Sequence, residues 1–223
     1  AFATYGVLDQ GAVLQPLAAP QDVIPNYGGL EITTSSTALQ ALTDAVLYLV
    51  SYPYDCTEQL ASRILAISAL RDVLTAFDAE GLPSPQEMED AVRRDIEMLQ
   101  GLQNDDGGFP YWRRTQPSIP FNTIHTAHAL ARAQSKGFEV PADMQQRALA
   151  YLRQIETHYP SWYSRQTRQT LSAYALYVRD LMGDSDPAKA QNLLDDAGVE
   201  DLSLDALGWL WPVLQDSPNA NSQ

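Results

Sequence analysis

The 223-residue sequence contains a single cysteine, Cys56, so no disulfide bond can form within it. It also lacks an apolar run long enough to span a membrane as a helix. The first residues show no basic segment followed by an apolar block, and any export signal is therefore expected upstream. Basic residues are scarce: 14 lysines and arginines stand against 28 aspartates and glutamates, a net charge of −14. Such a chain repels a phosphate backbone, and we do not expect it to bind nucleic acid.

The rest of the composition, with 45% hydrophobic and 19% charged residues, is typical of a folded globular protein. Residues 1–33 hold several prolines and glycines and show no helical period. They predict an extended linker or a strand remnant of a preceding domain, with short strands at 2–8 and 30–34. We expect a helical domain over residues 34–216 and a tail over 217–223.

From Ser35 onward, apolar residues recur every three or four positions, which predicts a series of helices. The predicted helices run over about 35–50, 56–77, 84–102, 122–135, 144–155 and 171–181, with two more starting near Asp186 and Ser203. Short connections make neighbouring helices antiparallel, so the predicted class is all-α and built from helical hairpins. Alanine-rich stretches at 126–133 and 171–175 suit the inner helices of an α/α toroid. Periodicity alone leaves an open bundle or a solenoid equally possible.

The residues around Cys56 carry the main chemical signal. Residues 52–59 read Tyr-Pro-Tyr-Asp-Cys-Thr-Glu-Gln, a Cys-x-Glu-Gln motif at a predicted helix start. Residues three apart share one helix face, so the Cys56 thiol and the Gln59 amide should meet. The thiol could then displace ammonia and leave an internal thioester, since well-oriented intramolecular pairs reach effective molarities on the order of 10⁵ M or more. Alternatively, Cys56 only packs in the core and Gln59 only covers the surface.

Neighbouring residues favour the reaction. We expect Asp55 to be the helix N-cap and Glu58 to complete a capping-box-like pair with it. The free N–H groups and the positive end of the helix dipole would stabilise the Cys56 thiolate and the oxyanion of an acyl-transfer intermediate. Tyr52 and Tyr54 would supply apolar cover against water.

Residues 52–59 closely resemble the thioester signature of the alpha-2-macroglobulin and complement-type proteins, especially the bacterial branch. Residues 28–63, the glycine-aromatic loop at 104–112, and the segments 137–141 and 208–212 resemble that family as well, so the resemblance covers nearly the whole chain. It implies a terpenoid-cyclase-like α/α toroid, incomplete here, within a much larger exported protein. Two departures stand out: many members have Gly in place of Asp55, and animal members often have Gly in place of Thr57.

The resemblance implies a single-use covalent trap for proteases, without a cofactor, and not a turnover enzyme. Cleavage of a bait region elsewhere would expose the thioester. A lysine amine of the protease would then attack the Gln59 carbonyl, and Cys56 would leave as a thiol. Its partners would be proteases and neighbouring domains of the same chain. The parent protein would be periplasmic or membrane-associated, located in the periplasm or anchored at the outer surface. The alternatives are an α/α-toroid enzyme, such as a glycosidase or terpene-type synthase, and a non-reactive scaffold domain.

The three histidines and an aspartate pair complete the candidate residues. His125 and His128 share a helix face but lack a third ligand, so hydrogen bonding or packing is favoured over a metal site. His158 is a possible acyl-transfer residue by resemblance, because some family members use a histidine on the concave face. Asp105 and Asp106 are predicted to form a turn with Gly107 and not to bind a metal ion.

Overall fold

The computed structural model describes residues 54–76 and 83–215, together with scattered single residues between 6 and 52. The chain divides into two units, Ala1–Ser36 and Thr37–Gln223. The described residues of the first unit are exposed and form turns, bends or irregular backbone. Most of the predicted strands at 2–8 and 30–34, most of the predicted helix at 35–50, and the tail at 217–223 lie outside the described residues. The three predicted domain ranges stay predictions.

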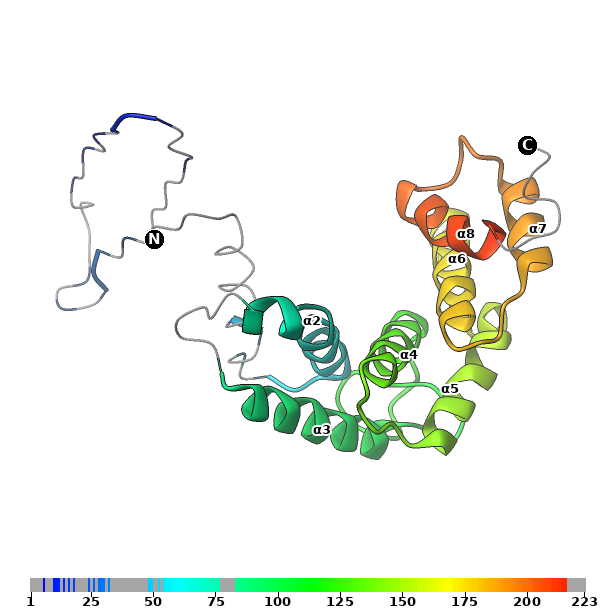
Figure 1. The fold of residues 1–223 in the computed structure, drawn as a ribbon. Helices are drawn as coiled ribbons and strands as arrows, with labels where there is room; N and C mark the ends of the chain where they lie inside the picture. Colours follow the sequence, from blue (N-terminus) through cyan, green and yellow to red (C-terminus); the bar gives the residue numbers. More distant parts are fainter. Residues whose placement is uncertain are drawn as a thin grey trace. The chain divides into compact units, whose positions relative to one another are not determined.

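The described part of the second unit is helical (Figure 1). In chain order its elements are α2 (Thr57–Ala76), α3 (Pro85–Leu102), α4 (Pro120–Ser135), α5 (Ala142–Arg153), the 3-10 helix η1 (Ile155–His158), α6 (Arg165–Leu181), α7 (Pro187–Ala197) and α8 (Leu204–Gln215). No strand occurs within the described ranges, and the all-α prediction is confirmed. Closure into a toroid stays a prediction. None of these described helices combines the length and apolarity needed to cross a membrane.

Several helix starts follow directly from capping chemistry. Ser84, where the helix predicted over 84–102 begins, caps α3 in a full capping box with Glu87. Asp186 caps α7 by accepting from the backbone N–H of Lys189. The start predicted for α6 was several residues too late, because its first turn is polar and adds nothing to the apolar stripe. Ser164 caps this turn by accepting from the N–H of Thr167, so the helix forms without early burial.

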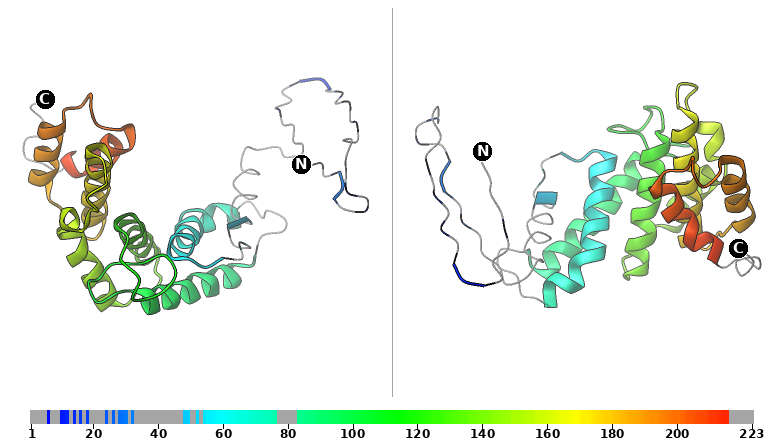
Figure 2. Two further views of the ribbon diagram at one scale, coloured as in Figure 1. Left: turned by 180° about the vertical axis from the view of Figure 1, so that it is seen from behind. Right: turned by 90° about the horizontal axis from the view of Figure 1, so that it is seen from above.

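Two packed cores hold the second unit together. In the larger one, α2 packs against α3 and α4, and α4 continues to α5 and α6. Its largest fully buried side chains include Phe109, Leu60, Ile64, Leu99 and Leu130. In the smaller one, α6 is flanked by α7 and α8 (Figure 2). Helix α6 belongs to both cores and so links the two.

The loop between α3 and α4 forms the predicted turn and reaches the start of α2. Its N–H at Gly107 donates to the carbonyl of Asn104 (3.0 Å), and Gly107 has φ +85°. A Cβ at this position would lie 2.2 Å from the Arg147 carbonyl oxygen, so only glycine fits. Further along, the carbonyl of Tyr111 accepts a hydrogen bond from the N–H of Thr57 (2.9 Å). The loop therefore satisfies an otherwise unpaired donor in the first turn of α2.

Candidate functional site

The first turn of α2 begins one residue later than the sequence suggests. The helix starts at Thr57, and the carbonyl of Cys56 accepts the first intrahelical bond, from Leu60 (3.0 Å). Cys56 is therefore the N-cap residue, and Gln59 is at the third helical position. The backbone N–H of Cys56 donates to Oε1 of Gln59 (3.2 Å). The prediction that Asp55 is the N-cap, with Glu58 as its capping-box partner, was wrong.

This arrangement is half of a capping box with cysteine in the place of serine or threonine. In a capping box the third helical residue reaches back to the N–H of the cap residue, and the side chain of the cap residue points toward the same turn. The hydrogen bond that caps the helix therefore also brings the Gln59 side chain to Cys56. Cys56 is buried, with 4% of its surface exposed, while Gln59 is half-buried.

The orientation of the Gln59 amide follows from this contact. A backbone N–H can only donate, so the atom facing Cys56 must be the oxygen. In a thioester this oxygen would be the carbonyl oxygen, and it would carry the negative charge of the tetrahedral intermediate. The Cys56 N–H is positioned as a donor to that charge, as in an oxyanion hole.

Asp55 has a different role from the one predicted, because Arg63 binds its carboxylate. Nη2 of Arg63 lies 2.9 Å from Oδ1 of Asp55, and the same guanidinium makes two bonds, of 2.6 and 2.8 Å, to Asp95 on α3. Arg63 and Asp95 are both buried. The bond to Asp95, more than that to Asp55, raises the pKa of Arg63 above its ordinary value. Arg63 thus fixes the residue before Cys56 and offsets its negative charge.

Aromatic residues gather around the start of α2. The rings of Tyr52 and Tyr54 are 5.6 Å apart, and Tyr48 lies 5.4 Å from Tyr52. Tyr54 is 58% exposed and Tyr111, whose carbonyl binds Thr57, is 47% exposed. Shielding of the reactive pair by Tyr52 and Tyr54 stays a prediction.

His125 and His128 make hydrogen bonds, as favoured from the sequence. His125 bonds to Ser62 on α2, and both rings bond to the hydroxyl of Tyr174 on α6. Within the described residues, no group of three or more histidine, cysteine, aspartate or glutamate side chains is arranged to hold a metal ion.

His158 lies apart from this group. It ends η1, and its ring stacks on Tyr151 with a centroid separation of 3.7 Å. Partial burial lowers its pKa below the ordinary value for histidine. In the described part of the chain, no hydrogen bond or ring contact joins it to Cys56 or Gln59. A role in acyl transfer stays a prediction.

No protein-family model matches the chain. It is 25% identical over 180 residues to alpha-2-macroglobulin of Rickettsia conorii, covering 79% of this chain and 9% of that one. It is 26% identical over 209 residues to an alpha-2-macroglobulin homolog of Yersinia pestis, covering 90% and 10%. A circularly permutated Ras protein 2 of Dictyostelium discoideum is 32% identical over 145 residues, 61% of this chain and 4% of that protein.

Solved structures of bacterial alpha-2-macroglobulins have a fold similar to that of this chain. Native alpha-2-macroglobulin of Escherichia coli, from domain MG7 to the C-terminus, matches with a TM-score of 0.66 and 22% identity over 80% of this chain and 29% of that one. Salmonella alpha-2-macroglobulin reacted with methylamine matches with a TM-score of 0.68 and 23% identity over 81% of this chain and 12% of that one.

The fold is thus that of a helical region found in bacterial alpha-2-macroglobulins. Sequence relatives of that name cover most of the chain, and the resemblance to the bacterial alpha-2-macroglobulin family is confirmed. The chain spans only 4% to 10% of the length of these curated relatives.

Proposed function

We propose that this chain is the thioester-bearing domain of an alpha-2-macroglobulin-like protease inhibitor. Cys56 and Gln59 form an internal thioester between Sγ and Cδ with loss of ammonia. A lysine amine of a protease attacks that carbonyl and becomes covalently attached. Each Gln59 acyl group is spent once, so the protein is a trap and not a turnover enzyme.

The observation that carries the proposal is the hydrogen bond between the Cys56 N–H and Gln59 Oε1 (3.2 Å) at the start of α2. It brings the acyl group to the thiol-bearing residue before any covalent bond exists, which lowers the entropic cost of closing the ring. It also supplies a donor to the oxygen on which charge develops. Burial of Cys56 would protect the thioester from water.

The ionic surroundings of the pair are compatible with this chemistry. A free carboxylate beside Cys56 would disfavour the thiolate through like-charge repulsion. Arg63 binds the Asp55 carboxylate at 2.9 Å, so that repulsion is largely offset. The departure from the family's usual glycine at Asp55 is therefore no obstacle to the thioester.

The remaining parts of the proposal rest on the family alone. The bacterial alpha-2-macroglobulin relatives are far longer than this chain, so the bait region and the domains that enclose the thioester would belong to a larger parent protein. We place that parent outside the cytoplasm, in the periplasm or at the outer surface. Its partners would be proteases and its own neighbouring domains.

Intact mass measurement tests the proposal. Freshly prepared full-length protein should weigh less than its sequence by one ammonia per chain and show no free thiol. Methylamine should then add one methylamine at Gln59 and release one thiol at Cys56. A full sequence mass, a free thiol and no methylamine adduct in the full-length protein would instead favour a non-reactive scaffold domain.

A further inference from the structure

A continuous chain of hydrogen bonds leads from Glu58, the residue before Gln59, across three helices. The Ser62 hydroxyl donates to Glu58 Oε1 (2.8 Å) and lies 2.9 Å from Nε2 of His125 on α4. Nδ1 of His125 lies 3.3 Å from the hydroxyl of Tyr174 on α6. That hydroxyl is 2.9 Å from Nδ1 of His128, and Nε2 of His128 accepts from Nε of Arg132 (3.4 Å).

The direction of every bond in this chain is fixed by its two ends. Arg132 can only donate, so His128 accepts at Nε2 and, when neutral, must donate from Nδ1 to Tyr174. Tyr174 then has one proton to give, to Nδ1 of His125. His125 in turn donates from Nε2 to Ser62, whose own proton goes to the Glu58 carboxylate. All donors point toward Glu58, from a guanidinium at one end to a carboxylate at the other.

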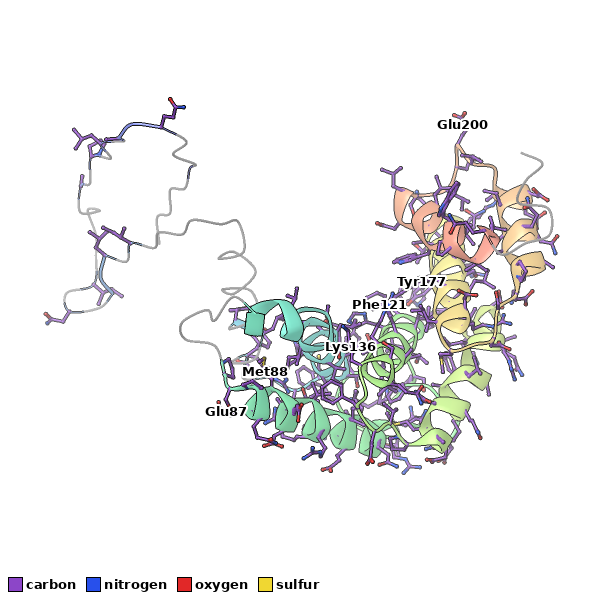
Figure 3. The ribbon with its side chains drawn as sticks, in the orientation of Figure 1. Glu87, Met88, Phe121, Lys136, Tyr177 and Glu200 are labelled. Carbon is purple, nitrogen blue, oxygen red and sulfur yellow. The ribbon has the colours of Figure 1, made fainter. Side chains whose placement is uncertain are left out.

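The two histidines must be neutral for this arrangement to hold, and their surroundings favour that state. Burial lowers the pKa of His125, and burial together with Arg132 lowers the pKa of His128 to about 4. Phe121 stacks on His125 at 5.5 Å and Tyr177 meets His128 edge-on at 5.5 Å; both rings are labelled in Figure 3. Among the described residues, His125 interacts with Glu58 and Ser62 from α2, with His128 from α4 and with Tyr174 from α6, whereas Arg132 faces His128.

We propose that Glu58 accepts the proton that an amine loses on attacking the thioester, and that Ser62, His125 and Tyr174 are positioning residues that hold its carboxylate. This inference rests on the proposed function, because it requires the Cys56–Gln59 thioester. Glu58 precedes the acyl residue in the same first turn of α2. Oε2 can take up a proton while Oε1 remains bonded to Ser62.

The step balances without any further reactant. The amine nitrogen forms a bond to Cδ of Gln59, the Cδ–Sγ bond breaks, and its electron pair stays on Sγ of Cys56. The nitrogen has become positively charged and gives one proton to Glu58. Glu58 returns that proton to the Cys56 thiolate, so the products are an amide and a thiol. The Cys56 N–H stabilises the oxyanion between the two stages.

The test measures methylamine reaction rates in the full-length protein, normalised to the thioester content of each variant. Glu58→Gln keeps the bond from Ser62 but removes the base, and should slow the reaction at least about 100-fold, as is typical for loss of a general base. Ser62→Ala, His125→Gln and Tyr174→Phe should each slow it roughly 3- to 10-fold, the size expected for loss of one hydrogen bond. Ser62→Thr keeps the hydroxyl and should react near the wild-type rate.

Ser68→Ala is the matched control for Ser62→Ala. Ser68 is a buried serine on the same helix, and its hydroxyl has no hydrogen-bond partner in the described structure. Its replacement should leave the rate unchanged. If Ser68→Ala slows the reaction as much as Ser62→Ala, the effect comes from helix packing and the proposal is wrong.

The pH dependence separates a proton-handling role from a structural one. Protonated His125 would donate from both nitrogens, so the bond to Ser62 stays but the Tyr174 proton loses its acceptor, and the chain breaks between Tyr174 and His125. The wild-type to Tyr174→Phe rate ratio should therefore be high at neutral pH and approach one as the pH falls below the ordinary range of histidine. Protonation of the amine cancels in this ratio. A ratio that stays constant with pH, or equal rates at all pH values, overturns the proposal. A wild-type protein without the mass deficit would instead refute the proposed function itself.

Discussion

Oε1 of Gln59 accepts the backbone N–H of Cys56 at 3.2 Å, so one contact serves both the cap of α2 and the alignment of a thiol with an acyl group. The two roles can be separated, because capping needs only an acceptor at position 59 whereas thioester formation needs an amide. A polar acceptor at the third helical position is a common structural device. With cysteine as the N-cap residue, the same contact also places a nucleophilic thiol beside an acyl group.

Replacing Gln59 with glutamate should remove the chemistry and keep the fold. The carboxylate still accepts the Cys56 N–H and interacts favourably with the helix dipole, so the unfolding free energy should change by no more than about 0.5 kcal/mol. Thioester formation should be abolished, since a thiol does not displace oxide from a carboxylate. Cys56→Ser installs a preferred N-cap residue, so this variant should also keep its stability and form no thioester. Methylamine labelling together with thermal unfolding measures both effects; continued labelling of Gln59→Glu would contradict the assignment of the acyl residue.

Arg63 should matter far more for stability than Asp55, although the two are bonded to each other. Arg63→Met leaves the buried Asp95 with only the exposed Arg94 (3.2 Å) as a partner and should cost about 3 kcal/mol of unfolding free energy. Asp55→Asn breaks an ion pair whose carboxylate is 44% exposed, and should cost no more than about 1 kcal/mol.

The double variant Arg63→Met with Asp95→Leu removes both buried charges and should recover most of the stability lost in Arg63→Met. Urea denaturation of the variants gives the comparison. Equal losses in Asp55→Asn and Arg63→Met would mean that the pair with Asp95 is not the dominant contact.

The sequence predicts the local parts of this structure well. The Cys56–Gln59 contact was predicted from a spacing of three residues, within which helix geometry determines the contact. The helix starts at Ser84 and Asp186 were also predicted correctly, since a proline at the first helical position follows each of them. The role of Asp55 was wrong because its partner, Arg63, lies two turns away and is itself fixed by Asp95 on another helix. Such a competition between a local cap and a tertiary ion pair is decided by packing.

The hydrogen-bond chain from Glu58 to Arg132 could likewise be predicted from the sequence only where its members are close along one helix. Ser62 is one helical turn from Glu58, and this pair could have been predicted from the four-residue spacing. His125 and His128 were correctly favoured as hydrogen-bonding residues. Their common partner, Tyr174, is on α6, and the sequence offers no signal that links it to α2 or α4.

Gly107 should tolerate no side chain, in contrast to Gly101. A Cβ at Gly107 would lie 2.2 Å from the Arg147 carbonyl oxygen, at a φ of +85°. Gly107→Ala should therefore cost at least about 2 kcal/mol of unfolding free energy and displace the loop that carries Tyr111. Gly101 is inside α3, where a Cβ would meet nothing within 4 Å. Gly101→Ala should stabilise the protein by roughly 0.5–1 kcal/mol. Thermal unfolding of both variants decides the matter, and similar melting temperatures would show that the loop yields easily.

Asp184 should make the stability of the α5–α6–α7 region depend on pH. Its carboxylate bonds to Arg153 at 2.7 Å and to the buried Arg179 at 2.7 Å. Arg153 first, and then Arg179, lower the pKa of Asp184 to about 2, from an ordinary value of 3.8. A lowered pKa means that the folded state favours the ionised form, so the contribution is fully present above pH 3.8 and is lost as the pH falls through about 2.

Asp184→Asn should accordingly lower the unfolding free energy by about 1–2 kcal/mol at pH 7, after allowance for partial exposure, and by almost nothing near pH 2. Arg147→Gln breaks an exposed pair with Asp143 within one helix (3.3 Å) and is the matched control. Its cost should stay under about 0.5 kcal/mol. Urea denaturation of the two variants and the wild type across this pH range checks the sign. A loss in Asp184→Asn that persists undiminished at pH 2 would mean that shape and hydrogen bonding at residue 184, and not its charge, hold Arg153 and Arg179 in place.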